Sequence, residues 1–142
     1  PVVLNVPYME GLYINNWVDS SSSGTTDANR LTPFYNNQHV LEVNLNNTPF
    51  VNNSMNYAFS GCENLTRVYN VSNKVTSMTS TFRDCDSFRE VQIPNSVVDM
   101  YSTFLNCSQF GYKFPASFQI PDSVVNIGDT FKIVKVLIFQ FR

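Results

Sequence analysis

The sequence has little charge, one histidine, one tryptophan and no long hydrophobic run. Charged residues make up 14% of its 142 residues and the net charge is −2, so charge predicts neither a nucleic-acid surface nor an acidic disordered tail. No segment reaches the ~18 consecutive apolar residues that a membrane-spanning helix needs. The chain begins with Pro1 and shows no signal peptide, so we expect a processed piece of a longer protein.

Patterns typical of catalysis, cofactors and metals are also scarce. His39 has no partner Ser or Cys whose local sequence suggests an activated nucleophile, so we expect a surface or turn histidine rather than a catalytic one. The three cysteines are widely spaced, at positions 62, 85 and 107, without a C-x₂-C pair. We expect buried free thiols, with a disulfide or a metal site as alternatives. No cofactor is predicted.

Small polar and aromatic residues take the place of charge. Asn, Ser and Thr total 43 residues, and Phe and Tyr total 19. Such a chain forms helices poorly and favours strands and turns. The length suits one domain with a single core.

An internal repeat organises the apolar residues. Five phenylalanines recur at nearly even spacing, with Met or Ile four residues before most of them and Cys three residues after three of them. A period of about 20–29 residues is typical of a solenoid whose coils stack, because one coil cannot bury its own apolar face. The predicted core ladder is Phe34, Phe59, Phe82, Phe104, Phe131, Met55, Met78, Met100, Cys62, Cys85 and Cys107, with Ile127 in the methionine column.

The local sequence predicts strands and short turns. "FREVQIP" alternates Val91 and Ile93, expected inward, with Glu90 and Gln92, expected outward. "YAFSGC" and "STFLNC" each predict a single helical turn, and no long helix is expected anywhere. "PVVLNV" and "GLYINNWV" have strand composition.

The repeats resemble a known family. "SMNYAFSGCENLTRV", "SMTSTFRDCDSFREVQIPNSV", "DMYSTFLNCSQF" and "FQIPDSVVNIGDTF" are similar to the BspA-like (treponemal-type) leucine-rich repeat. The resemblance implies a β-rich, right-handed solenoid with a parallel sheet on one side. It also implies a non-enzymatic binding role on bacterial or protist surfaces or in phage-borne proteins, and it supplies no catalytic residues.

The pattern divides the chain into three parts. Residues 34–131 are expected to form a solenoid of about four to five coils. Residues 1–33, which include a Ser/Gly/Thr-rich loop, form an N-terminal cap or the end of a preceding domain, with Trp17 as a lid. Residues 132–142 form a capping or assembly strand, because the apolar run 133–142 would otherwise be an aggregation-prone edge. It is expected to pair with the last coil, another domain or another chain.

The outward face of the repeat sheet is the candidate binding site. Glu42, Arg67 and Glu90 should line up across the strands, and opposite charges there could simply pair. Alternatively, the face recognises a protein or a glycan, with tyrosines as anchors. The candidate ligand-binding residues are Glu42, Asn44, Arg67, Tyr69, Arg89, Glu90, Gln92, Tyr112 and Lys113, with Asn70 at the rim.

Two further features have competing interpretations. Asp84 and Asp86 could act in a polysaccharide hydrolase or bind calcium, but helix-start capping is the simpler interpretation. Five N-x-[ST] sequons would matter only in a secreted eukaryotic protein, and the one before Cys107 is doubtful. The sequons begin at Asn46, Asn52, Asn64, Asn70 and Asn106.

These observations predict a surface adhesion or receptor-binding module that is extracellular, on a cell surface or on a phage particle. Its expected partner is a protein or glycan of a host or neighbouring cell, with no nucleic acid and no membrane span. One alternative is a structural subunit of a multimeric appendage, filament or phage tail, self-assembled through 133–142. The other is a β-solenoid polysaccharide hydrolase.

Overall fold

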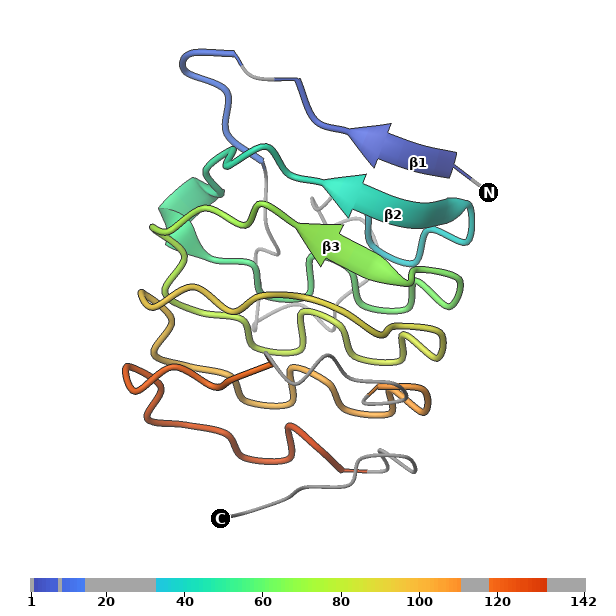
Figure 1. Ribbon diagram of the computed structural model, residues 1–142, viewed down its shortest axis with the longest axis vertical. Coiled ribbons are helices and arrows are strands. Elements are labelled where there is room, and N and C mark those ends of the chain that lie inside the picture. The colour runs from blue at the N-terminus through green and yellow to red at the C-terminus, as the bar shows by residue number, and fades with distance from the viewer. Residues whose placement is uncertain (1, 8, 15–32, 111–117, 133–142) are drawn as a thin grey trace, which may run out of the picture.

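A parallel sheet forms one side of the protein in the computed structural model, which describes residues 2–7, 9–14, 33–110 and 118–132. Strands β1 (Val2–Asn5), β2 (Val40–Asn44) and β3 (Arg67–Tyr69) lie side by side in that order, and both neighbouring pairs are parallel (Figure 1). Among the described residues, the only helix is the 3₁₀ turn η2, Val51–Asn53. The predictions of a parallel sheet and of no long helix are therefore confirmed for this part of the chain.

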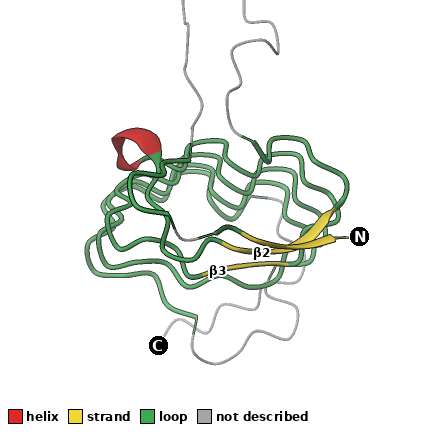
Figure 2. Cartoon of the chain, turned by 90° about the horizontal axis from the view of Figure 1, so that it is seen from above, coloured by secondary structure: helices red, strands yellow, loops and turns green. Residues whose placement is uncertain are grey.

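A second extended leg, here called the bridged leg, lies on the other side of each coil. Isolated parallel bridges join Ser54 to Ser77, Ser77 to Asp99, and Asp99 to Asn126. The spacing of these bridge partners follows that of the phenylalanines from Phe59 onward. Seen from above, successive coils overlie one another (Figure 2). Equivalent positions of the repeat therefore lie next to each other along the stack.

Backbone hydrogen bonds of the bridged leg alternate between two directions. The amides of Met55, Tyr57 and Phe59 donate to carbonyls of the next coil, at 2.9, 3.0 and 2.9 Å. The amides between them bond within their own coil: the Ala58 amide donates three residues back to the Met55 carbonyl at 2.9 Å, and the Asn56 amide donates to Ser54 Oγ at 3.2 Å. Later coils repeat this pattern. Half of the amides therefore connect coils and the other half close turns.

The predicted helical turns are wrong for this reason. An α-helix needs consecutive amides to bond four residues back, but every second amide here bonds to the next coil. The chain instead makes successive β-turns, several with a residue of positive φ at the third position, as type II turns require. Two columns share this conformation: Tyr57, Ser80, Ser102 and Asp129 have φ of 60°, 52°, 54° and 53°, and Asn36, Gly61, Asp84 and Asn106 have φ of 55°, 78°, 60° and 61°.

The core is a column of stacked phenylalanine rings. The ring centroids of Phe34 and Phe59 are 4.9 Å apart, those of Phe59 and Phe82 are 5.6 Å apart, and those of Phe82 and Phe104 are 5.7 Å apart. Met55, Met78, Met100 and the three cysteines are fully buried beside this column. Stacked rings add to the stability that burial alone provides.

The last described coil departs from the predicted ladder. Phe131 stacks on Phe104 at 6.0 Å but is only partly buried. Ile127 occupies the methionine column and is 50% exposed, although Met100 in the preceding coil is fully buried. The prediction of an inward Ile127 is therefore wrong, because no described coil covers its outer side.

The predicted strands form with less regularity than expected. Val91 and Ile93 are buried and Glu90 and Gln92 are exposed, as the alternation predicts, but only one isolated bridge, between Arg67 and Glu90, is present here. In the N-terminal part, the strand predicted in 1–6 is β1. In 11–18 only Ile14 forms a bridge among the described residues, and its partner is Phe50.

Other predictions fall outside the described residues. Trp17 and the segment 133–142 are among them. The domain boundaries stay a prediction, although β1 pairs with β2, with a register shift between Val2 and Val3, and so extends the repeat sheet.

Side-chain donors form ladders that the sequence did not reveal. The thiols of Cys62, Cys85 and Cys107 donate to the carbonyls of the phenylalanines one coil earlier, at 2.8, 3.0 and 2.9 Å. In the same way, the hydroxyls of Thr81, Thr103 and Thr130 donate to the carbonyls of Met55, Met78 and Met100. Buried donors need such partners, so these ladders favour one register of the coils.

Burial determines the chemistry of the cysteines. All three are free, and burial raises the pKa of Cys62 to about 12. Burial also raises the pKa of Cys85 and Cys107. Since the thiolate is the form that binds metals and attacks electrophiles, these thiols are inert at neutral pH. The prediction of buried free thiols is confirmed.

The raised thiol pKa predicts a loss of stability at high pH. Folded Cys62 keeps its proton up to a pKa of about 12, whereas the reference value is 9.0. The unfolded chain therefore releases protons first, so the free energy of unfolding is retained below pH 9 and falls as the pH rises from 9 toward 12. Urea unfolding at about pH 8 and about pH 10.5 measures this loss. The loss should be smaller in Cys62→Ala, and an equal loss would contradict the prediction.

Candidate functional site

The outward face of the sheet presents two columns of side chains. The first contains Val3, Glu42, Arg67 and Glu90, because Val3 pairs with Glu42, Glu42 with Arg67, and Arg67 with Glu90. The second contains Asn5, Asn44 and Tyr69. The structure thus brings together most of the predicted binding residues of β2 and β3.

Arg67 lies at the centre of this face. Its guanidinium is 3.6 Å from Glu42 and 3.7 Å from Glu90, and its carbon Cζ lies 4.2 Å from the centre of the Tyr69 ring. The Arg67 side chain is 42% exposed, so each ion pair contributes only about 0.2–1 kcal/mol. The main effect of these contacts is to hold Arg67 and Tyr69 in one arrangement.

Asparagines connect the strands beside Arg67. The Asn44 amide donates to Asn5 Oδ1 at 3.2 Å, and the Asn70 amide donates to Asn44 Oδ1 at 2.9 Å. The backbone amide of Asn46 also donates to Asn44 Oδ1, at 2.9 Å. Sequence reasoning missed Asn5 because it precedes the recognisable repeats. The available signal was that Asn5 ends a strand-like segment, as Asn44 ends β2, which would have predicted that the two asparagines pair.

The remaining predicted binding residues lie outside strands β2 and β3. Arg89 and Gln92 are exposed on the strand-like segment after Phe88. Tyr112 and Lys113 lie outside the described residues. The site that the structure describes therefore centres on Glu42, Arg67 and Tyr69.

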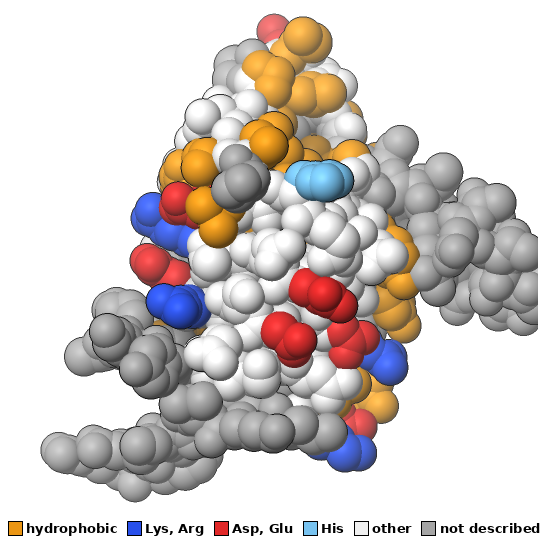
Figure 3. All heavy atoms as spheres, turned by 90° about the vertical axis from the view of Figure 1, so that its right-hand side faces the viewer, with side chains coloured by type: hydrophobic (Ala, Val, Ile, Leu, Met, Phe, Trp, Pro, Cys, Tyr) orange, Lys and Arg blue, Asp and Glu red, His pale blue; other side chains and the backbone are white. Residues whose placement is uncertain are grey.

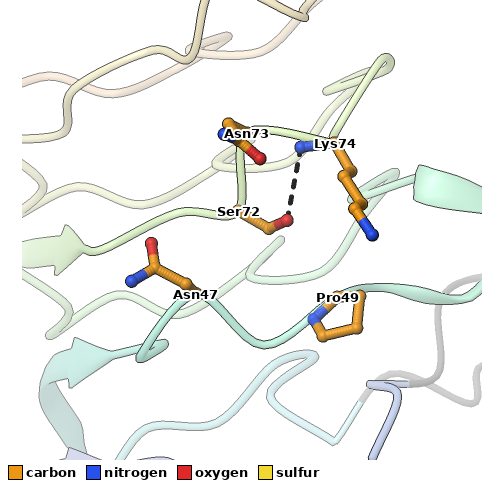
Figure 4. A pocket seen from close by; sticks show the side chains of 5 residues that line it. All are labelled: Asn47, Pro49, Ser72, Asn73 and Lys74. Atoms are coloured by element: carbon orange, nitrogen blue, oxygen red, sulfur yellow. Dashed lines mark hydrogen bonds between the residues drawn. The ribbon is translucent and has the colours of Figure 1, made fainter. Parts of the chain in front are cut away.

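A shallow pocket of about 380 Å³ lies where the chain leaves the sheet (Figure 4). Its walls come from two successive loops, after β2 and after β3, and the Lys74 amide donates to Ser72 Oγ at 3.3 Å. Amides, a hydroxyl and one ammonium group line it, so it offers mainly hydrogen-bond donors and acceptors. The lining residues are Asn47, Pro49, Ser72, Asn73 and Lys74.

Comparison with protein families agrees with this architecture. The model of the BspA type leucine-rich repeat region matches residues 32–132 in six copies. The chain belongs to this family. No curated protein and no solved structure matches it. Its repeats indicate a protein-interaction module, and in the described residues no helix has the length and hydropathy to cross a membrane.

Asp84 and Asp86 lie in the turns of the BspA-type repeats, and the Asp84 carboxylate takes part in the hydrogen bonds between coils. Asp84 has φ of 60° in a turn and accepts a bond of 2.7 Å from the Asn106 amide. The Asp86 side chain is exposed, while its carbonyl accepts the Gln109 amide at 3.2 Å. No helix begins here, so the capping interpretation is wrong. The described residues contain no group of three potential metal ligands.

His39 and the sequons occupy turns and loops of the BspA-type repeats. His39 is exposed just before β2, as expected for a surface histidine, and its amide donates to Asn37 Oδ1 at 2.8 Å. The side-chain amide of Asn64 donates to the Gln38 backbone carbonyl at 2.8 Å. Asn52 is exposed, whereas Asn46 is half-buried. These placements give no indication of catalysis.

Proposed function

We propose that this chain is a non-enzymatic module that binds a protein through the outward face of its sheet. The observation that carries the proposal is the arrangement of Glu42, Arg67 and Glu90 in one row, with Tyr69 under the Arg67 guanidinium. Arginine and tyrosine are enriched among the residues that dominate binding energy at interfaces. Both lie here on strand β3 rather than on a loop.

The contacts that fix the Arg67 and Tyr69 side chains favour binding for an entropic reason. An interface loses about 0.5–1.5 kcal/mol for each flexible side chain that it must immobilise. The contacts of Arg67 with two carboxylates and a ring reduce that loss before a partner arrives. The charges of Glu42, Arg67 and Glu90 alternate in sign along the row. They therefore favour a partner that presents the opposite charge at each facing position.

The setting that fits this proposal is extracellular. We infer a closed, right-handed solenoid acting in adhesion or receptor recognition on a cell surface or a phage particle. The family relationship supports this inference. A purely contact-based mechanism needs no catalytic group, in keeping with the structural use of Asp84 and the buried thiols.

A binding screen with matched variants tests the proposal. The chain is immobilised and exposed to arrays of purified surface proteins and of glycans, and hits are measured again with Arg67→Ala and Tyr69→Ala. We expect a protein ligand whose affinity falls at least tenfold in both variants, since such anchors contribute about 2 kcal/mol or more.

Arg83→Ala is the matched control. Arg83 has similar side-chain exposure, 45% against 42% for Arg67, and its ion pair is with Asp84 in the turns. Its replacement should leave the affinity unchanged. A ligand that binds equally to wild type and to both sheet-face variants would place the binding site elsewhere.

A further inference from the structure

The pocket between the loops after β2 and β3 lies where the repeat departs from its own pattern. In two later coils, the hydroxyls of Ser96 and Ser123 donate to a valine carbonyl of the preceding coil, at 2.6 and 2.7 Å. Lys74 occupies the same position in its own coil, directly before the valine whose amide closes the turn. The Lys74 side chain forms no hydrogen bond or ion pair with another described residue. The bond that joins the later coils at this position is therefore missing here.

The coil before Lys74 departs from the pattern at the same place. There the chain makes the 3₁₀ turn η2, in which Asn52 has φ of 57°. The later coils cross this region with a single turn, in which, for example, the Val97 amide donates to the Pro94 carbonyl at 3.1 Å. Two successive coils thus differ from the rest of the stack where the pocket opens. Departures from the local rules of a fold are expected at functional sites.

The lining of the pocket offers several hydrogen-bonding groups to a ligand. In the part of the chain that the structure describes, the side chains of Asn47, Asn73 and Lys74 have no hydrogen-bond partner. Ser72 Oγ accepts the Lys74 backbone amide at 3.3 Å, so its hydroxyl can still donate. Figure 4 shows the Lys74 side chain extending from the loop after β3 toward the loop that carries Pro49. The pocket therefore combines one positive charge, two carboxamides, a hydroxyl and an apolar ring.

The charge of the pocket favours an anionic ligand. None of the five lining residues is acidic. Acidic side chains gather instead on the side of the molecule where the strands begin, which faces the viewer in Figure 3. The pocket lies where the strands end. An anionic group in the pocket would therefore meet the Lys74 ammonium without a competing carboxylate in the lining.

We propose that this pocket binds an acidic saccharide through a ring that carries a carboxylate. The Lys74 ammonium pairs with the carboxylate, and the two carboxamides bond to ring hydroxyls, which donate and accept as the carboxamides do. Sulfate offers acceptors only, so it would leave the carboxamide oxygens without a partner. A volume of about 380 Å³ lies within the range of small-ligand sites. The pocket shares no residue with the row of Glu42, Arg67 and Glu90, so the two sites are independent.

Titration of the isotope-labelled full chain with sodium glucuronate, followed by two-dimensional NMR, tests the proposal. We expect a dissociation constant on the order of a millimolar, as suits a ligand of about a dozen non-hydrogen atoms. Glucose lacks the carboxylate and sulfate lacks the hydroxyls, so each should bind at least about fivefold more weakly. The amide signals that respond should be those of the lining, namely Asn47, Ser72, Asn73 and Lys74.

Matched lysine variants test the role of the charge. Lys74→Gln keeps the length of the side chain but removes its charge, so it should weaken glucuronate binding at least about fivefold. Lys132→Gln is the control, because Lys132 is an exposed lysine in the last described coil, and it should leave the affinity unchanged. Glucuronate that shifts no lining signal at about 50 mM, well above the expected dissociation constant, would overturn the proposal. So would glucose or sulfate that binds as tightly as glucuronate, or a Lys74→Gln chain that binds glucuronate like wild type.

Discussion

Replacing Phe82 with alanine should lower the free energy of unfolding by about 3–5 kcal/mol, the range observed when a buried aromatic ring is removed. Phe82 has no solvent exposure. Its ring lies 5.6 Å from Phe59, 5.7 Å from Phe104 and 4.1 Å from Phe88. The variant therefore leaves a cavity between three rings and interrupts the column in the middle of the stack.

Phe131→Ala is the matched control. The two phenylalanines occupy the same repeat position, but Phe131 is only partly buried at the last described coil. In a stack where each coil contacts only its neighbours, an end position loses fewer contacts. Chemical denaturation should show a clearly smaller loss for Phe131→Ala. If the two variants lost equal free energy of unfolding, the middle of the phenylalanine column would contribute no more to stability than its last described position.

The repeat predicted the core because burial constrains spacing. Apolar residues that recur once per coil can all be buried only if successive coils stack in register, so the phenylalanine and cysteine columns followed directly. The same argument failed for Ile127. Periodicity identifies equivalent positions, but it does not show whether a further coil covers the last of them.

The turns could not be predicted in this way. Helical turns and successive β-turns both place Phe59 and Cys62 on the inner side, so the apolar pattern does not distinguish them. The difference lies in the backbone: Tyr57 and Ser80 adopt positive φ, which is uncommon for residues other than glycine. The identities of these two residues therefore did not predict their positive φ.

The candidate site was predictable where it depends on register. Once the valines of successive strands align, Glu42 and Arg67 must be neighbours. The asparagine ladder was not predictable, because Asn5 belongs to β1, which precedes the repeats. The exposure of Val98 and Val125 was also not predicted, because an outward valine cannot be told from a core valine before the coils have been placed.

Ser80→Pro should be strongly destabilising, by about 3 kcal/mol or more. Proline restricts φ to about −65°. Ser80, in contrast, has φ of 52°. Proline also lacks the amide that Ser80 donates to the Tyr101 carbonyl at 2.9 Å. The substitution thus opposes the turn and removes one bond between coils, and urea unfolding of the variant measures the combined effect.

Ser80→Gly separates the turn from an ordinary loss of packing. Glycine adopts positive φ without a steric penalty, which gains about 1–2 kcal/mol, while its larger unfolded entropy costs about 0.5–1 kcal/mol. Its stability should therefore remain within about 1 kcal/mol of wild type, since the loss of the small buried side chain offsets the rest. If the segment were a helical turn, glycine would be clearly destabilising. A large loss in Ser80→Gly would therefore contradict the alternating turns on which the stacking of the coils depends.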